Sequence, residues 1–163
     1  MKNSVGFNVF IMFLMLALDL ITKLWVRANI PLYQMNRLLE NFIDLTHVQN
    51  RGVSFSFLSD MHDAIRVPLL VGVSSIAVLI MIIYQIVYWY ELEFYVRLGL
   101  IFVLPGAIGN LIDRIFFGYV TDFLHFRFYE ISFFVNNLAD CFISIGAFFL
   151  IISTIFYKSK IKN

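Results

Sequence analysis

Four long apolar segments limit what this chain can fold into. They cover approximately residues 7–26, 67–90, 94–115 and 131–157, and Pro105 interrupts the third. Each approaches or exceeds the ~20 residues that an α-helix needs to cross a bilayer. The composition agrees, because 61% of the 163 residues are hydrophobic and 14% are charged, against roughly 45–50% and 25% in soluble domains. We therefore predict one integral-membrane domain over residues 1–163 with four transmembrane helices.

The first segment also has the length of a secretory signal peptide. No small-x-small cleavage site follows it, because Leu18-Asp19-Leu20 lacks the small residues that such a site needs. We interpret it as a retained span. The C-terminal tail carries lysines at 158, 160 and 162 and no acid, which predicts a cytoplasmic C-terminus. An even number of spans then places the N-terminus on the cytoplasmic side as well.

Charge and cysteine content exclude several kinds of partner. The net charge is +1, so nothing in the charge balance favours nucleic acid. A single cysteine, Cys141, excludes an intrachain disulfide and a cysteine-based zinc cluster. We expect neither a metal nor an organic cofactor.

Polar residues interrupt the apolar segments at three of their ends. They are Asp19, Thr22 and Lys23 in the first, Asn110, Asp113 and Arg114 in the third, and Asn137 and Asp140 in the fourth. Spacings of three and four residues place each group on one helical stripe. Because successive spans alternate in direction, all three ends lie on the same side of the membrane. A carboxylate at membrane depth costs roughly 3 kcal/mol unless it is paired or faces water, so we expect one polar site there.

The loops on that side of the membrane show β patterns. Residues 42–48 are rich in β-branched and aromatic residues, the Asn50-Arg51-Gly52 turn follows, and residues 53–57 alternate apolar residues with serine. In 124–128, Leu and Phe alternate with His125 and Arg127. We predict a small antiparallel sheet that rests on the outer membrane surface. Asp122 would lie where the loop after the third span enters this sheet.

Five stretches of this chain resemble, in the same order, motifs of the bacterial lipoprotein signal peptidase family, signal peptidase II. They are Asp19-Leu20-Ile21-Thr22-Lys23, Asn50-Arg51-Gly52-Val53-Ser54-Phe55-Ser56, Gly106-Ala107-Ile108-Gly109-Asn110-Leu111-Ile112-Asp113-Arg114, Val120-Thr121-Asp122-Phe123 and Asn137-Leu138-Ala139-Asp140. The third run is the most specific, and together the five cover essentially the whole chain. Two positions depart from the family pattern: Asn136 replaces the usual aromatic residue, and Ser54 replaces the usual alanine.

The resemblance implies an all-α membrane fold of four transmembrane helices with a small extracytoplasmic antiparallel β-cradle. It implies an intramembrane aspartic endopeptidase of the bacterial inner membrane. Such an enzyme removes signal peptides from diacylglyceryl-modified prolipoproteins and cuts on the N-terminal side of the lipidated cysteine. Both termini would be cytoplasmic, and the active site would lie at the outer face. The expected partners are these substrates and membrane lipid, with no nucleic acid, and we expect a monomer.

The resemblance also implies roles for ten residues by motif position. Asp122 and Asp140 would be the catalytic pair. The residues expected to bind substrate are Asn50, Gly52, Asn110, Arg114 and Asn137. The residues expected to give structural support are Asp19, Lys23 and Asp113.

Other interpretations of the same residues stay open from the sequence. Asp140 could be a core acid paired with Arg114, Asp113 could pair with Arg114, and Asp122 could be a loop residue. Cys141 as a nucleophile lacks a base and points about 100° from Asp140 on a helix.

Metal binding is a further alternative. It would use Asp122 with His47, His62 and His125, but these residues have no metal-ligand spacing. A proton-coupled transporter or channel also uses buried acids, but it needs polar access from both faces. A membrane scaffold would need no polar stripes at all.

Overall fold

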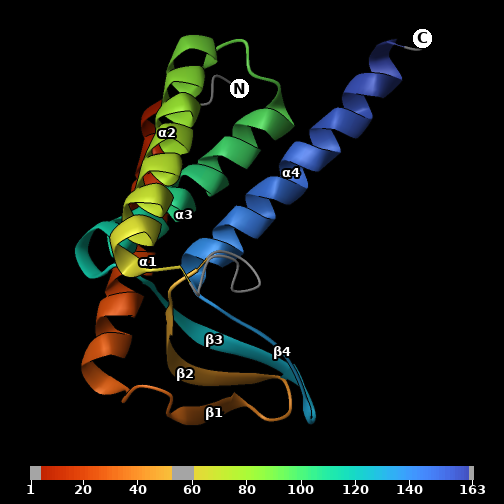
Figure 1. Cartoon of the computed structure of the whole chain (residues 1–163). Helices are drawn as coiled ribbons and strands as arrows, with labels where there is room; N and C mark the ends of the chain where they lie inside the picture. The colour runs from red at the N-terminus through yellow and green to blue at the C-terminus, as the bar shows by residue number, and fades with distance from the viewer. Residues whose placement is uncertain (1–4, 53–60, 162–163) are drawn as a thin grey trace.

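In the part of the chain that the structure describes, four helices are long and apolar enough to cross a membrane. The computed structural model describes residues 5–52 and 61–161. The helices are α1 (Val5–Asn29), α2 (Asp63–Tyr88), α3 (Phe94–Phe117) and α4 (Leu138–Ile161) (Figure 1). The prediction of four spans is therefore confirmed.

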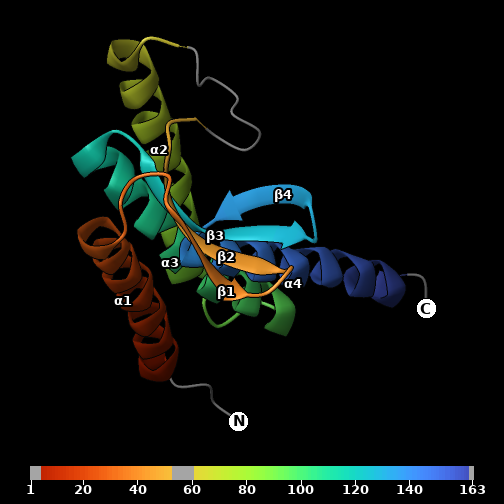
Figure 2. The ribbon, with the colours of Figure 1, turned by 90° about the horizontal axis from the view of Figure 1, so that it is seen from below.

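The described residues contain four strands, which form one antiparallel sheet in the order β1-β2-β3-β4. They are β1 (Met35–Leu39), β2 (Ile43–Asn50), β3 (Val120–Phe128) and β4 (Ile131–Asn136). The sheet lies at one end of the helices, which we call the sheet end of the bundle (Figures 1 and 2). The described part of α1 begins, and α4 ends, at the opposite end of the bundle (Figure 1).

The strands confirm part of the β prediction and correct another part. The strands expected in 42–48 and 124–128 are present as β2 and β3. The expected start of the fourth span at residue 131 was wrong, because 131–136 form β4 and the helix begins only at Leu138. The aromatic and β-branched residues of this segment pair with β3 rather than continuing the helix. The strand expected in 53–57 lies outside the described residues.

α3 is the central helix of the bundle. Half of its most apolar 18-residue window is buried, against 11–22% in the other three spans. Its contact with α4 is close because two glycines face each other: a Cβ on Gly146 would lie 2.6 Å from the carbonyl oxygen of Gly99. Pro105 lies within α3, and the helix continues through it, as membrane helices allow.

Two short connections bring the sheet and the helices together. α3 ends at Gly118, whose φ of 75° is favourable for glycine and whose N–H donates to the Arg114 carbonyl at 3.1 Å. β3 begins two residues later. At the other end of the hairpin, only Asn137 separates β4 from α4. Because β3 and β4 pair with each other, the end of α3 and the start of α4 meet beside the same hairpin.

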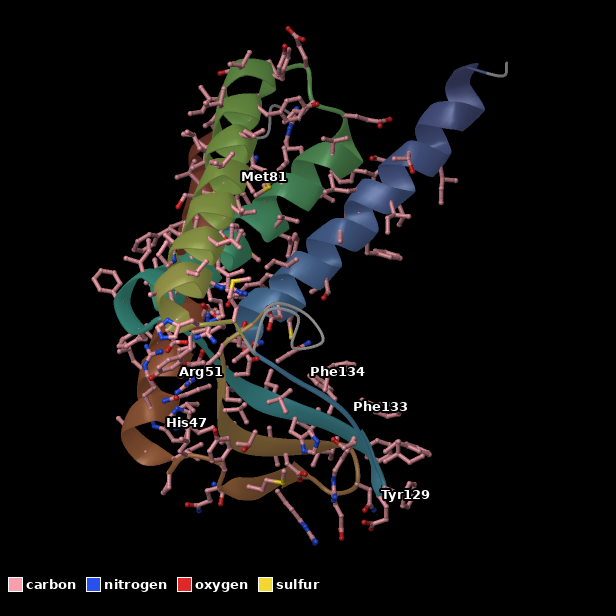
Figure 3. The ribbon with its side chains drawn as sticks, viewed as in Figure 1. His47, Arg51, Met81, Tyr129, Phe133 and Phe134 are labelled. Atoms are coloured by element: carbon pink, nitrogen blue, oxygen red, sulfur yellow. The ribbon has the colours of Figure 1, made fainter. Side chains whose placement is uncertain are left out.

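A small apolar core fixes the sheet against the helices. It consists of Val26, Ile30 and Phe123, with Leu45, Leu124 and Leu138 packed around them. These residues come from the end of α1, the sheet and the start of α4. Figure 3 shows Arg51 at the level where helices and sheet meet, whereas Tyr129 lies at the far tip of the sheet.

Candidate active site

The structure brings the polar groups of three helices and two strands together at the sheet end. Asn137 lies at the centre and is fully buried. Its Nδ2 donates to Asp122 Oδ1 at 2.6 Å and to Asn110 Oδ1 at 3.3 Å. Its Oδ1 accepts the main-chain N–H of Asp140 at 2.9 Å, and Asp140 Oδ2 accepts the N–H of Asn137 at 3.3 Å. This reciprocal pair resembles a capping box, so the start of α4 and the polar site form one structure.

Asn110, in the C-terminal half of α3, connects Asn137 to the second carboxylate. Its Nδ2 donates to Asp140 Oδ1 at 2.8 Å, and its Oδ1 accepts from Lys23 Nζ at 2.8 Å. An ammonium group only donates hydrogen bonds, so Lys23 fixes which way the Asn110 amide points. The two aspartates are therefore joined through two oriented carboxamides, Asn137 and Asn110.

Asp122 lies in β3 and is 2% exposed. Its Oδ2 accepts from Asn50 Nδ2 at 2.9 Å, opposite the bond from Asn137. The pKa of Asp122 is raised to about 7: burial is the largest cause, the negative charge of Asp140 acts in the same direction, and the bonds from Asn50 and Asn137 act against them. A carboxyl group with this pKa exchanges a proton near neutral pH.

Arg114 and Gly52 lie along one side of the pair. Gly52 N–H donates to Asn50 Oδ1 at 3.1 Å, which orients the amide that holds Asp122. Arg114 Nη2 lies 3.4 Å from the Gly52 carbonyl oxygen, and its Nη1 lies 3.5 Å from the Asn110 carbonyl oxygen. These are long contacts, so much of the hydrogen-bonding capacity of the guanidinium is available to a ligand.

Three fully buried charges support the site from the side of α1: Asp19, Lys23 and Asp113. Lys23 Nζ lies 2.9 Å from Asp19 Oδ2 and 3.6 Å from Asp113 Oδ2. Asp19 Oδ1 also accepts the N–H of Ala139 in the first turn of α4, at 2.9 Å. A carboxylate at a helix N-terminus is favourable there.

Two of the ion pairs considered from the sequence are not formed. Among the ion pairs of the described residues, Asp113 binds Lys23 and Arg27 of α1 rather than Arg114. No ion pair joins Arg114 to Asp140 in that part of the chain. Adjacent residues on a helix point about 100° apart, so Asp113 faces α1 while Arg114 faces the turn after β2.

Sequence reasoning missed two residues, Arg27 and Thr121. Arg27 Nη1 lies 3.0 Å from Asp113 Oδ1 and 2.6 Å from Thr121 Oγ1. The signal was present, because Arg27 follows Lys23 by four residues and so continues the polar stripe of α1 by one turn. The first apolar segment ends at about residue 26, so the apolar pattern leaves Arg27 just outside the predicted span.

Two glycines of α3 allow this close assembly. A Cβ on Gly106 would lie 2.5 Å from the Ala139 carbonyl oxygen. A Cβ on Gly109 would collide with Asp19 Oδ2. The Gly-x-x-Gly spacing therefore lets α3 approach the start of α4 and the carboxylate that caps it.

The residues of the thiol and metal alternatives lie as follows. Cys141 is half-buried on α4. The histidines each contact a different group: a main-chain carbonyl for His47, a main-chain N–H at the start of α2 for His62, and a serine hydroxyl for His125. Among the described residues, no three His, Cys, Asp or Glu side chains are grouped to hold a metal ion.

Sequence comparisons with known proteins point to one family. A family profile described as signal peptidase (SPase) II matches residues 11–156. Lipoprotein signal peptidases from three bacteria are similar over most of their length. That of Nostoc punctiforme is 41% identical over 87% of this chain and 85% of its own. That of Bartonella tribocorum is 36% identical over 99% of this chain and 94% of its own. That of Streptococcus pneumoniae is 35% identical over 88% of this chain and 88% of its own.

Two solved structures, both described as bacterial membrane enzymes, share this fold. One has a TM-score of 0.83 and covers 96% of this chain and 92% of its own, at 21% identity. The other has a TM-score of 0.77, with 93% and 94% covered, at 22% identity.

Proposed function

Because this chain belongs to the signal peptidase II family, we propose that Asp122 and Asp140 are the catalytic pair with which it hydrolyses its substrates. Its activity is that of the family, an aspartic-type protease that removes signal peptides from prolipoproteins. The observation that carries the assignment of the pair is the link through Asn137 and Asn110, which holds one carboxylate from β3 and one from α4 in a single buried network.

The chemistry follows from two carboxyl groups that share one proton. Like charges at short range do not both ionise cheaply, so one group stays protonated while the other is ionised. The ionised carboxylate takes a proton from a water molecule, and the oxygen of that water attacks the peptide carbonyl carbon. The protonated group donates to the carbonyl oxygen, which gives a tetrahedral diol. Proton transfer to the amine nitrogen then releases the two products and restores the pair.

We propose that the neighbouring amides and the arginine orient the substrate. Asn50 and Asn137 hold Asp122 on both of its oxygens, so its position is fixed before the substrate arrives. Arg114 and Gly52 lie beside the pair at the edge of the network, where the substrate's main chain and the lipid-linked cysteine would be bound. Cleavage would then fall on the N-terminal side of the diacylglyceryl-modified cysteine.

We also propose the orientation in the membrane. The sheet end, with the catalytic pair, faces the outer side of the inner membrane, and both termini are cytoplasmic, since lysines 158 and 160 lie in the last turns of α4 and lysine 162 follows it. We propose that the enzyme acts as a monomer within surrounding lipid.

The test is cleavage of a lipidated precursor by the purified protein in detergent. The wild-type protein should cut it, and Asp122→Asn and Asp140→Asn should each abolish cleavage while the protein stays folded. Glu40→Gln makes the same acid-to-amide change at a side chain 77% exposed in the β1–β2 turn, and it should cut normally. Full activity of either aspartate variant would refute the assignment, and a wild-type protein without cleavage would favour a transporter or a scaffold.

A further inference from the structure

Arg27 is a charged residue at the sheet end of α1 to which no role has been assigned. Its Nη1 donates to Asp113 Oδ1 at 3.0 Å and to Thr121 Oγ1 at 2.6 Å. Its guanidinium lies 4.2 Å from the centre of the Phe117 ring, at the end of α3. The side chain is 15% exposed. Arg27 therefore connects α1, the end of α3 and the start of β3 through one planar group.

Thr121 is held at two points by this arrangement. Its main-chain N–H donates to Asp113 Oδ2 at 2.9 Å, and its hydroxyl accepts from Arg27. The same carboxylate thus binds Arg27 with one oxygen and the strand with the other. Thr121 is fully buried, so no water replaces the arginine on its hydroxyl without a rearrangement.

Asp122 is the next residue along β3. Successive side chains of a strand point to opposite faces, so a strand fixed by Thr121 on one face presents Asp122 on the other. There Asp122 meets Asn50 and Asn137. A rotation or shift of Thr121 would change the direction of the Asp122 carboxylate toward both of these amides.

We propose that Arg27 is a positioning residue for peptide cleavage, which acts through Thr121 to fix the Asp122 carboxylate. This inference rests on the proposed function of Asp122. Lysine is a poor substitute because it is a point charge, whereas the planar guanidinium stacks on Phe117 and donates to two acceptors. Arg27 itself touches neither the substrate nor the reacting atoms.

The expected effect is on the chemical step. A misplacement of about 1 Å in a catalytic group costs on the order of 10²-fold in rate. Arg27→Ala should therefore lower kcat by about 10- to 100-fold per folded molecule, with KM unchanged, because the interaction lost acts in the transition state. Thr121→Val keeps the shape and removes the acceptor hydroxyl, so it should lower kcat in the same way.

The experiment measures kcat and KM on a lipidated precursor for Arg27→Ala, Arg27→Lys, Thr121→Val and the double variant of Arg27→Ala with Thr121→Val. We expect Arg27→Lys to recover part of the rate, and the double variant to be no slower than Arg27→Ala alone. Arg37→Ala, at an arginine 73% exposed on β1, is the matched control and should behave as wild type. If Arg27→Ala does not fold, Arg27→Lys and Thr121→Val carry the test.

Three results would overturn the inference: a normal kcat with lowered thermal stability, a raised KM with normal kcat, or multiplicative effects in the double variant. The first would make Arg27 a structural ion pair, and the second would make it a substrate contact. Wild-type enzyme and Asp122→Asn are run alongside. Failure of wild type to cut, or activity in Asp122→Asn, refutes the proposed function, whereas normal kcat in Arg27→Ala with both behaving as expected refutes only the role of Arg27.

Discussion

Asn137 donates to Asp122 Oδ1 at 2.6 Å with the same side chain whose oxygen caps the start of α4. A helix cap and a contact to a proposed catalytic group are therefore one residue. Formation of the first turn of α4 brings Asp140 to the network and at the same time places the donor for Asp122. The geometry of the site is thus coupled to the folding of the helix start.

The pKa of Asp122 predicts how cleavage depends on pH. This pKa is raised to about 7, with burial as the largest cause, so the group is protonated below pH 7 and ionised above it. A pair that shares one proton needs that proton to donate to the substrate carbonyl. We expect kcat/KM, which reports on the free enzyme, to fall as pH rises through about 7. A rate that stays constant to pH 9 would contradict a shared proton with this pKa.

Asn50→Ala should shift the pH at which kcat/KM falls. Asn50 donates to Asp122 and lowers its pKa, so its removal raises the pKa and shifts the fall in kcat/KM to higher pH. Asn36→Ala, the same change at an exposed position of β1, is the matched control, and its profile should be that of wild type. A shift to lower pH in Asn50→Ala would show that the amide does not stabilise the ionised carboxylate.

Gly109→Ala should damage both stability and activity. The added methyl group would collide with Asp19 Oδ2, and Asp19 holds Lys23 and the first turn of α4. Overpacking of this kind costs about 1–3 kcal/mol, which a lowered melting temperature in detergent would report.

Gly72→Ala is the control for this prediction. A Cβ on Gly72 of α2 meets nothing within 4 Å, and alanine favours a helix over glycine by about 1 kcal/mol. This variant should be as stable as wild type or more so. Equal melting temperatures for Gly109→Ala and wild type would mean that Asp19 moves aside without loss.

Features that depend on residues close together in the sequence could be predicted from it, whereas features that depend on contacts between distant residues could not. Apolar length predicts the four spans, and spacing of three and four residues predicts that Asp19 and Lys23 share a face, because both are local properties. The segment 131–136 is apolar enough to extend a helix, and its pairing with β3 depends on a contact that local periodicity does not encode. The spacing of four residues from Lys23 places Arg27 on the same helical stripe, but its contact with Thr121, 94 residues away, is not encoded locally.

Labelling from the two sides of the membrane tests the proposed orientation. Glu130 lies in the β3–β4 turn and Glu91 between α2 and α3, in exposed positions at opposite ends of the bundle. Each is replaced by cysteine in a separate variant. In a Cys141→Ala background, an impermeant thiol reagent added outside should label position 130 alone. Labelling of both from the outside would contradict four spans, and labelling of position 91 alone would reverse the orientation.

The metal and thiol alternatives predict that a chelator or Cys141→Ala stops cleavage, whereas the aspartate pair predicts that neither does. If two carboxyl groups perform the hydrolysis, cleavage should continue at the same rate in a metal chelator and in Cys141→Ala. The side chain of Cys141 points about 100° from that of Asp140 on the same helix. Loss of activity in chelator that added zinc restores would assign the reaction to a metal, and loss in Cys141→Ala would assign it to the thiol.

The last prediction concerns the diacylglyceryl group of the substrate. Each acyl CH₂ buried is worth about 0.8 kcal/mol, but a lipidated precursor already has its chains in the bilayer. That energy therefore sets the concentration and depth of the substrate rather than its selection. Selection requires the scissile bond to be fixed against Asp122 and Asp140, where about 1 Å of displacement costs on the order of 10²-fold.

We therefore expect a precursor that lacks the diacylglyceryl group to be cut about 10²-fold more slowly, even when its signal segment is inserted in the same micelles. The measurement compares initial rates on matched lipidated and unlipidated precursors. Arg114→Ala should narrow the difference, because Arg114 lies beside the pair with long, weak protein contacts and is free to bind the modified substrate. Equal rates on both precursors with wild-type enzyme would mean that lipid plays no part in recognition, and the enzyme would then act on inserted signal segments in general.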